Sequence, residues 1–156
     1  MSQPAEPAVR PPALDAAHPR QQNERPVFDN GFSHVAVSVA DLDAARHFYC
    51  DLLGFEELAR PDFGFGGMWM AVGDLQLHLI EVSEVTPPGA GLPHFALYVP
   101  TEEFPAVVDA LRDAGVPFFG PPRSRVDFDT TTVWQAFVSD PSGNVIELTD
   151  VGPRRS

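Results

Sequence analysis

The sequence predicts an α+β fold in which two βαβββ modules form a curled mixed-sheet cup around a central site. Two observations carry this prediction. An alternating strand with a histidine near its start occurs at residues 33–39 and again at 93–99, and His34 and His94 are 60 residues apart. A helix-start residue, a glycine that ends the helix and a turn before the last strand then follow in the same order in both halves. Repetition at a fixed period indicates a duplicated structural unit.

The first module is predicted over residues 31–82. Residues 33–39 alternate valine with histidine, alanine and serine, which is typical of a strand with one face on the core. Asp41 can cap the helix that follows, and Gly54 can end it in the left-handed conformation. Three strands are then expected, at 56–60, 67–72 and 75–82, with Gly73-Asp74 as the turn between the last two.

The second module is predicted over residues 92–150 and repeats this order. A strand is expected at 94–99, followed by a helix that starts at Thr101 and ends at Gly115. The segment 120–130 is predicted to be a long loop that forms a lid or binds substrate, because long ordered loops are often functional. Strands are expected at 116–119, 131–138 and 144–149, with Asp140 in the turn before the last.

The rest of the chain lies outside these modules. Residues 1–30 are rich in proline, alanine, glutamine and arginine and lack a periodic apolar face, so we expect a disordered N-terminal arm. Residues 83–91 contain the prolines and glycines of a linker between the modules. Residues 151–156 are expected to form a short tail.

Composition argues against several classes of function. The formal net charge is −12, whereas nucleic-acid surfaces need clustered lysine and arginine. No apolar run approaches the roughly 20 residues of a membrane-spanning helix. Cys50 is the only cysteine, which excludes an intrachain disulfide and cysteine-based metal clusters. We therefore expect a cytoplasmic protein with a small-molecule substrate and with no nucleic-acid or membrane partner.

Four potential metal ligands occupy equivalent positions in the two modules. In the first strand of each module the apolar residues take the helix-packing side, so His34 and His94 point to the opposite face. In the last strand, His78 of one module and Glu147 of the other share that face. If the two sheets curl toward each other, these side chains converge. Three imidazoles and a carboxylate suit a divalent ion of Zn, Ni, Co, Mn or Fe(II), although His78 could instead contact the substrate.

Further polar and aromatic residues are candidates for substrate binding. Arg123 and Arg125 in the predicted loop could hold an anionic group, and the alternative is that both are solvated. Aromatic side chains could line the cup, and the alternative for them is a place in the core or in a dimer contact. The aromatic candidates are Tyr98, Trp134, Trp69, Phe63 and Phe65.

Motifs in residues 31–150 point to a known family. They are Ser-His-Val-Ala-Val at 33–37, Phe-Tyr at 48–49 with Leu-Gly-Phe at 53–55, His-Phe-Ala at 94–96 and Asp-Pro-Ser-Gly-Asn-Val-Ile-Glu-Leu at 140–148. Together they resemble the vicinal oxygen chelate superfamily, which includes glyoxalase I, fosfomycin- and bleomycin-resistance proteins and extradiol dioxygenases. This resemblance implies a cup around a divalent metal held by His34, His94 and Glu147.

The resemblance also shapes the expected function. His78 stands where glyoxalase I-like members have a carboxylate, which is a departure from chemistry that uses carboxylates on both sides of the substrate. We expect a metal-dependent lyase or isomerase whose substrate chelates the metal through adjacent oxygens, with Glu147 moving the proton. The alternatives are an Fe(II) dioxygenase or a metal-free drug- or metabolite-binding protein. Members are often homodimers, and the linker leaves open whether the cup is built within one chain or across two.

Overall fold

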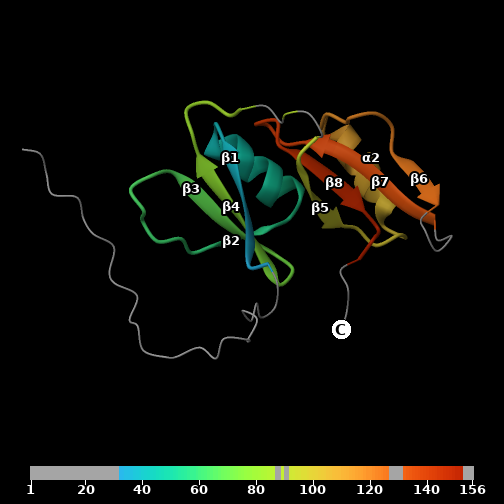
Figure 1. Cartoon of the computed structure of the whole chain (residues 1–156), viewed down its shortest axis with the longest axis horizontal. Coiled ribbons are helices and arrows are strands. Elements are labelled where there is room, and N and C mark those ends of the chain that lie inside the picture. The colour runs from blue at the N-terminus through green and yellow to red at the C-terminus, as the bar shows by residue number, and fades with distance from the viewer. Residues whose placement is uncertain (1–31, 87–88, 90–91, 127–131, 153–156) are drawn as a thin grey trace, which may run out of the picture. The chain divides into compact units, whose positions relative to one another are not determined.

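The computed structural model describes residues 32–86, 89, 92–126 and 132–152. The N-terminal arm predicted over residues 1–30 and most of the predicted tail lie outside the described residues. The described chain contains two mixed four-stranded sheets, one from each predicted module (Figure 1). The predicted α+β class and the duplicated arrangement are therefore confirmed.

The first sheet has the strand order β1-β4-β3-β2. β1 (His34–Val39) runs parallel to β4 (Leu75–Glu81), and the other neighbouring strands are antiparallel. The predicted turn before β4 is present, and Gly73 has a φ of 58°, which glycine adopts without a steric penalty. The remaining strands are β3 (Gly67–Val72) and β2 (Glu56–Leu58).

The helix between β1 and β2 changes its hydrogen-bonding pattern part-way along. The α-helix α1 (Leu42–Arg46) continues directly as the π-helix η1 (His47–Leu52), where the sequence predicted a single α-helix. Asp41 caps it as predicted, because its Oδ1 accepts a hydrogen bond from the Ala44 amide at 2.9 Å. The periodicity of the sequence did not predict the π-helix, because one inserted residue shifts the apolar stripe of the helix only locally.

The second sheet has the order β5-β8-β7-β6 and repeats the first. β5 (His94–Tyr98) runs parallel to β8, which is antiparallel to β7, and β7 is antiparallel to β6. The bounds of these three strands are Val145–Thr149 for β8, Thr132–Ser139 for β7 and Arg123–Val126 for β6.

Two predictions were wrong in the region of the fourth strand of this sheet, β6. Residues 116–119 do not form a strand and make only an isolated bridge, Phe118 with Val138. The fourth strand lies instead inside the predicted loop at 120–130. The reason is local: Gly120 has a φ of 82°, and the two prolines that follow it have no amide to donate. Pairing with β7 therefore resumes only after them, and residues 127–131 lie outside the described residues.

The helix of the second module, α2 (Phe104–Asp113), starts three residues later than predicted. The Thr101 hydroxyl donates to Asp150 Oδ2 at 3.0 Å and does not cap the helix. Pro105 lies in the first turn, where its missing amide leaves no hydrogen bond unmade. No helix in the described residues is long and apolar enough to cross a membrane.

The core is built from the predicted apolar faces. Side chains of both modules join one hydrophobic cluster, to which each sheet contributes one face and the helices contribute their apolar stripes. Full burial of a large apolar side chain is worth about 1.5–3 kcal/mol, so this cluster is the main source of stability. Its largest fully buried members are Tyr49, Phe104, Met68, Met70, Leu79, Ile146 and Leu148.

A buried carboxylate links the two modules. Asp140 is only 3 % exposed, and its Oδ1 accepts the amides of Ser142 and Asn144 at 2.9 and 2.8 Å. Its Oδ2 accepts the Tyr49 hydroxyl at 2.9 Å and the side-chain amide of Asn144 at 2.8 Å. Asn144 also donates to the Ser38 carbonyl at 2.9 Å. Asp140 is the turn residue that the sequence predicted, and in addition it joins the second module to the η1 helix of the first.

We predict that Tyr49→Phe destabilises the protein by about 1.5–3 kcal/mol, because a buried hydrogen bond to a charged acceptor is lost. Burial, followed by the charge and hydrogen bond of Asp140, raises the pKa of Tyr49 far above its usual range, so the donor keeps its proton. Urea denaturation gives the free energy of unfolding. The control is Tyr98→Phe, where the hydroxyl of a half-exposed side chain is removed and a change within about 0.5 kcal/mol is expected. Equal effects of the two substitutions would contradict the role of Asp140.

Candidate functional site

The predicted ligands lie on the sheet faces that point away from the core. Exposed positions alternate with partly buried ones along β5 and over the first four residues of β1, and His34 and His94 are exposed. Strand register makes the two modules equivalent, since Ala36 pairs with His78 and Ala96 pairs with Glu147. Each residue of β4 or β8 that is a candidate ligand therefore has a small alanine beside it, which leaves room above the sheet.

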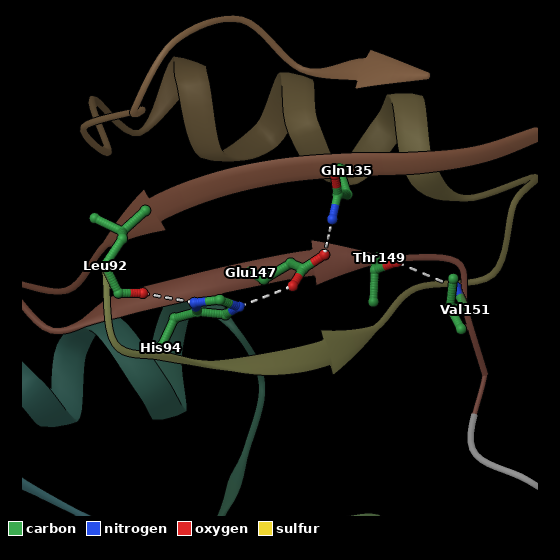
Figure 2. A network of polar contacts seen from close by, with 6 residues as sticks. All are labelled: Leu92, His94, Gln135, Glu147, Thr149 and Val151. Carbon is green, nitrogen blue, oxygen red and sulfur yellow. Dashed lines mark hydrogen bonds and ion pairs between the residues drawn. The ribbon is translucent and has the colours of Figure 1, made fainter. Parts of the chain in front are cut away.

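His94 and Glu147 form a close pair on the second sheet (Figure 2). His94 Nε2 lies 3.0 Å from Glu147 Oε2, and the two side chains are 34 % and 12 % exposed. His94 Nδ1 lies 2.7 Å from the Leu92 carbonyl, which can only accept, so Nδ1 carries a hydrogen. In neutral His94, Nε2 then presents a lone pair to a carboxylate oxygen. The pair needs a proton or a cation between these two atoms.

Gln135 holds the other oxygen of Glu147. Its Nε2 donates to Glu147 Oε1, and the residue is only 8 % exposed (Figure 2). Sequence reasoning missed this residue. The signal was a lone amide in the apolar strand β7, since a buried polar side chain needs a hydrogen-bond partner.

The backbone at Leu92 is strained. Its φ is 51°, and it is the one non-glycine residue with positive φ among the described residues. The left-handed conformation costs an L-residue on the order of 1–2 kcal/mol. The Leu92 carbonyl is the group that orients the His94 ring, so the strained residue supports a candidate ligand directly.

His34 and His78 form a pair of a different kind on the first sheet. Their rings are stacked, with centroids 4.2 Å apart and 13° between the planes. A ligating nitrogen directs its lone pair in the ring plane, and planes at this angle meet on the order of 15 Å away, whereas a metal–nitrogen bond is about 2.1 Å long. In this arrangement the two rings do not share one ion. His78 Nε2 also lies 2.8 Å from Gln76 Oε1, and His34 Nδ1 lies 2.9 Å from the Ser33 hydroxyl.

The described part of the chain does not gather the four residues. Among residues 32–86, 89, 92–126 and 132–152, no group of three or more histidine, cysteine, aspartate or glutamate side chains is placed to hold one metal ion. One chain therefore presents its four candidate ligands as two separate pairs, one pair on each sheet.

The predicted substrate-binding residues lie in different places. Tyr98 is half exposed and shares the face of His94 on β5. Arg123 is exposed on β6 opposite Gln135, and Arg125 pairs with Val133 in the same strand pair. Trp134 lies on the other face of β7, where its ring stacks on Phe104 of α2 with centroids 5.8 Å apart.

The donor set of the second sheet fits a divalent metal. Nitrogen and carboxylate oxygen are ligands of the borderline divalent ions, and the 3.0 Å between Nε2 and Oε2 is close to the spacing of neighbouring ligand atoms on one ion. Each of these side chains also makes a second hydrogen bond, His94 with the Leu92 carbonyl and Glu147 with Gln135. Such outer contacts fix the tautomer and the orientation of metal ligands.

Comparison with known proteins identifies the family. A family model described as the Glyoxalase/Bleomycin resistance protein/Dioxygenase superfamily matches residues 31–148. The chain belongs to this superfamily. A curated relative from Synechocystis, described as probable lactoylglutathione lyase, is 33 % identical over 131 residues, which cover 78 % of this chain and 96 % of the relative.

Solved structures show the same fold. The fosfomycin resistance protein FosX from Listeria monocytogenes superposes with a TM-score of 0.66 at 20 % identity, over 78 % of this chain and 93 % of that one. A protein from Bacillus anthracis assigned to the glyoxalase family superposes with a TM-score of 0.63 at 27 % identity, over 80 % and 98 % of the two chains. At its low identity, the likeness to FosX shows the fold alone.

We predict that the His78 imidazole titrates below its ordinary pKa of about 6.5. Burial, with further contributions from His34 and Arg60, lowers the pKa of His78. Because this pKa is lower in the folded state than in the unfolded state, the stability that neutral His78 contributes is present above about pH 6.5 and is lost as the pH falls toward the folded-state pKa. An NMR titration measures the midpoint, and His78→Gln identifies the resonance. A midpoint at or above 6.5 would contradict the environment described for this ring.

Proposed function

We propose that this protein is a metal-dependent lyase or isomerase of the glyoxalase type, acting on a small substrate that chelates the metal through adjacent oxygens. The observation that carries the proposal is the contact between His94 and Glu147. Nε2 and Oε2 lie 3.0 Å apart, and both side chains are oriented by second contacts. With neutral His94, both atoms have a lone pair to offer to a cation between them. Membership of the superfamily and the relative described as a lactoylglutathione lyase support the same class of reaction.

The residues that would hold the metal are His94 and Glu147, completed by His34. His34 has one ring nitrogen near the Ser33 hydroxyl, which leaves Nε2 as the nitrogen available to an ion. When bound, a divalent ion would act as a Lewis acid and stabilise negative charge on the chelating oxygens of the substrate. The ion could be Zn, Ni, Co, Mn or Fe(II), because imidazole and carboxylate ligands suit all of these.

Glu147 is the group proposed to move the proton. Its carboxylate takes a proton from the substrate carbon that carries a hydroxyl and returns it to the neighbouring carbonyl carbon, while the hydroxyl proton passes from the first oxygen to the second. The net reaction converts an α-hydroxycarbonyl unit to its isomer, with both protons accounted for. Gln135 keeps the carboxylate in place by donating to Oε1, which leaves Oε2, the oxygen 3.0 Å from His94 Nε2, as the atom proposed to accept the proton. Exchange of a proton at a positioned carboxylate contributes about 10²–10⁴-fold to a rate.

We infer that the site is completed across a homodimer. The two pairs of candidate ligands lie on separate sheets, and the part of the chain that the structure describes brings no three of these residue types together. In a dimer with twofold symmetry, the first sheet of one protomer can face the second sheet of its partner, and the symmetry then builds two identical sites.

We predict that protein purified without chelator and supplied with a divalent metal binds about one ion per chain, and that Glu147→Gln separates metal binding from activity. With the metal saturating, Glu147→Gln should lower the rate at least about 100-fold, because an amide cannot accept the proton. His94→Ala should lose both metal and activity. Elemental analysis gives the metal content, and lactoylglutathione formation from glutathione and methylglyoxal is the first assay.

His47→Ala is the matched control for this experiment. His47 is an exposed histidine on η1 that pairs with Asp51, and its removal should change neither metal content nor rate. Full activity of metal-loaded Glu147→Gln would overturn the proton-transfer mechanism. A wild-type protein that binds no ion would overturn the metal site and leave the metal-free binding protein as the function to test.

Mixing two inactive variants tests the dimer. His34→Ala removes a ligand of the first sheet and His94→Ala removes a ligand of the second. If each site combines sheets from two protomers, a refolded equimolar mixture contains hybrid dimers with one intact site, so about a quarter of the wild-type metal sites should return. A site built within one chain would give no recovery.

A further inference from the structure

A row of rings crosses the open face of the first sheet, beginning at His34. Trp69 and His78 are Cα partners on β3 and β4, with ring centroids 4.4 Å apart and 10° between the planes. His34 stacks on the other side of His78 at 4.2 Å. Beyond Trp69 lies Phe63 at 5.8 Å, and Phe65 lies 5.9 Å from Phe63. These five residues form the aromatic row.

The pairing of the strands explains the row. Side chains opposite each other on neighbouring strands have Cβ atoms about 4.5–5.5 Å apart, a distance that suits stacked flat rings. His34, His78 and Trp69 come from three adjacent strands and share the face that points away from the core. The stacked rings consequently turn their edges toward the space above the sheet, next to the candidate ligand His34.

The far end of the row is held in place although it is exposed. Phe63 and Phe65 are 51 % and 52 % exposed. The Arg60 guanidinium lies 5.0 and 4.9 Å from their ring centroids, and Nη2 donates to the Phe65 carbonyl at 3.1 Å. Asp62 Oδ1 also accepts the Gly64 amide at 2.8 Å, which closes the turn between the two phenylalanines. Half-exposed rings add little to the core, so this clamp pre-organises an apolar surface for a ligand.

His78 belongs to this row by its geometry. Its ring lies nearly parallel to both neighbours, Trp69 and His34, and its Nε2 lies 2.8 Å from Gln76 Oε1. A ring sandwiched in this way has both faces covered and presents only its edge to the space above the sheet. As the rings stand, it does not direct a lone pair to an ion shared with His34.

We propose that the aromatic row is the recognition wall for a planar, conjugated group of the substrate, and that His78 acts there as a stacking residue. This inference rests on the proposed function, because chelating oxygens near His34 leave the rest of the substrate beside His78 and Trp69. The positive ring edges of the row attract the negative face of a flat π-system, so an aryl substituent gains more than its buried area. An aliphatic substituent gains the area alone.

Two hydroxamates test this inference, since both chelate through adjacent oxygens and differ only in the group attached. Benzohydroxamate carries a phenyl ring and acetohydroxamate carries a methyl group. Their dissociation constants are measured by calorimetry on the Co²⁺-loaded protein. We expect benzohydroxamate to bind roughly tenfold more tightly, because a phenyl ring adds contacts with the row that a methyl group cannot make. Trp69→Leu should reduce this preference to within about threefold and leave acetohydroxamate binding unchanged within about twofold.

Two further variants distinguish a local effect of Trp69→Leu from misfolding. Phe63→Ala changes a half-exposed side chain of the loop and should also weaken the preference for benzohydroxamate. Trp134→Phe is the control, because Trp134 packs on Phe104 on the opposite face of the other sheet. This control should keep the preference. It also leaves Trp69 as the sole tryptophan, so benzohydroxamate should change the fluorescence of this variant.

The outcomes separate this inference from the proposed function. Metal-dependent binding of both hydroxamates with equal affinity, or a preference that survives both Trp69→Leu and Phe63→Ala, would overturn the aromatic row as a recognition wall and leave the metal site intact. If neither hydroxamate binds the metal-loaded protein, the proposed chelation of the substrate by the metal fails, and the inference fails with it. If Trp69→Leu changes the mass of the oligomer and not the preference, the row is a subunit contact and the inference is overturned.

Discussion

Beside the hydrophobic cluster that both modules share, one buried carboxylate organises the polar contact between them. Asp140 receives four hydrogen bonds. Two come from the backbone amides of Ser142 and Asn144, one from the side-chain amide of Asn144 and one from the Tyr49 hydroxyl. A charge in such a place is tolerated only because every lone pair direction has a donor. Removal of the carboxylate would leave several buried donors without a partner. The motif that begins with Asp140 therefore holds the modules together, and the residue has no part in the proposed chemistry.

Strand register is the second constraint, because it decides which residues can meet. A shift of one residue in β4 or β8 would turn His78 or Glu147 into the core and bring leucine or isoleucine to the open face. The observed register keeps alanine beside each of these residues and places Trp69 opposite His78. In the second sheet the equivalent partner of Glu147 is Phe137, whose ring meets His94 edge-on at 5.3 Å. The candidate site and the aromatic row are both consequences of the same pairing.

Much of the fold could be predicted from alternation and turn residues. The bounds of β3 agree fully with the prediction, and β1, β4 and β8 agree to within one residue at each end. The predictions were wrong where the backbone geometry determines the structure and the side-chain pattern does not. The π-turn of η1 and the position of β6 after the two prolines are of this kind. The later start of α2 has a tertiary cause, because the Thr101 hydroxyl finds Asp150 instead of the helix.

The candidate site was predictable only in part. Alternation correctly placed His34, His78, His94 and Glu147 on the open faces, because this depends on each strand alone. The contact of Gln135 with Glu147 depends on which residues two strands bring together, and the strained φ of Leu92 has no signature in the residue type. The stacking of His78 between two rings is likewise a property of three strands, and no single segment of the sequence contains it.

The register also has a stereochemical consequence. The two modules are equivalent in backbone, yet one offers a carboxylate and the other a flat imidazole at the same position. A site assembled from these two halves has a polar, proton-accepting side and an apolar, aromatic side. In the proposed reaction, a substrate between these two sides would meet the proton acceptor on one side only, so the hydrogen would be removed and returned on one face and a single enantiomer would form. The asymmetry that this requires lies in the difference between Glu147 and His78 at equivalent strand positions.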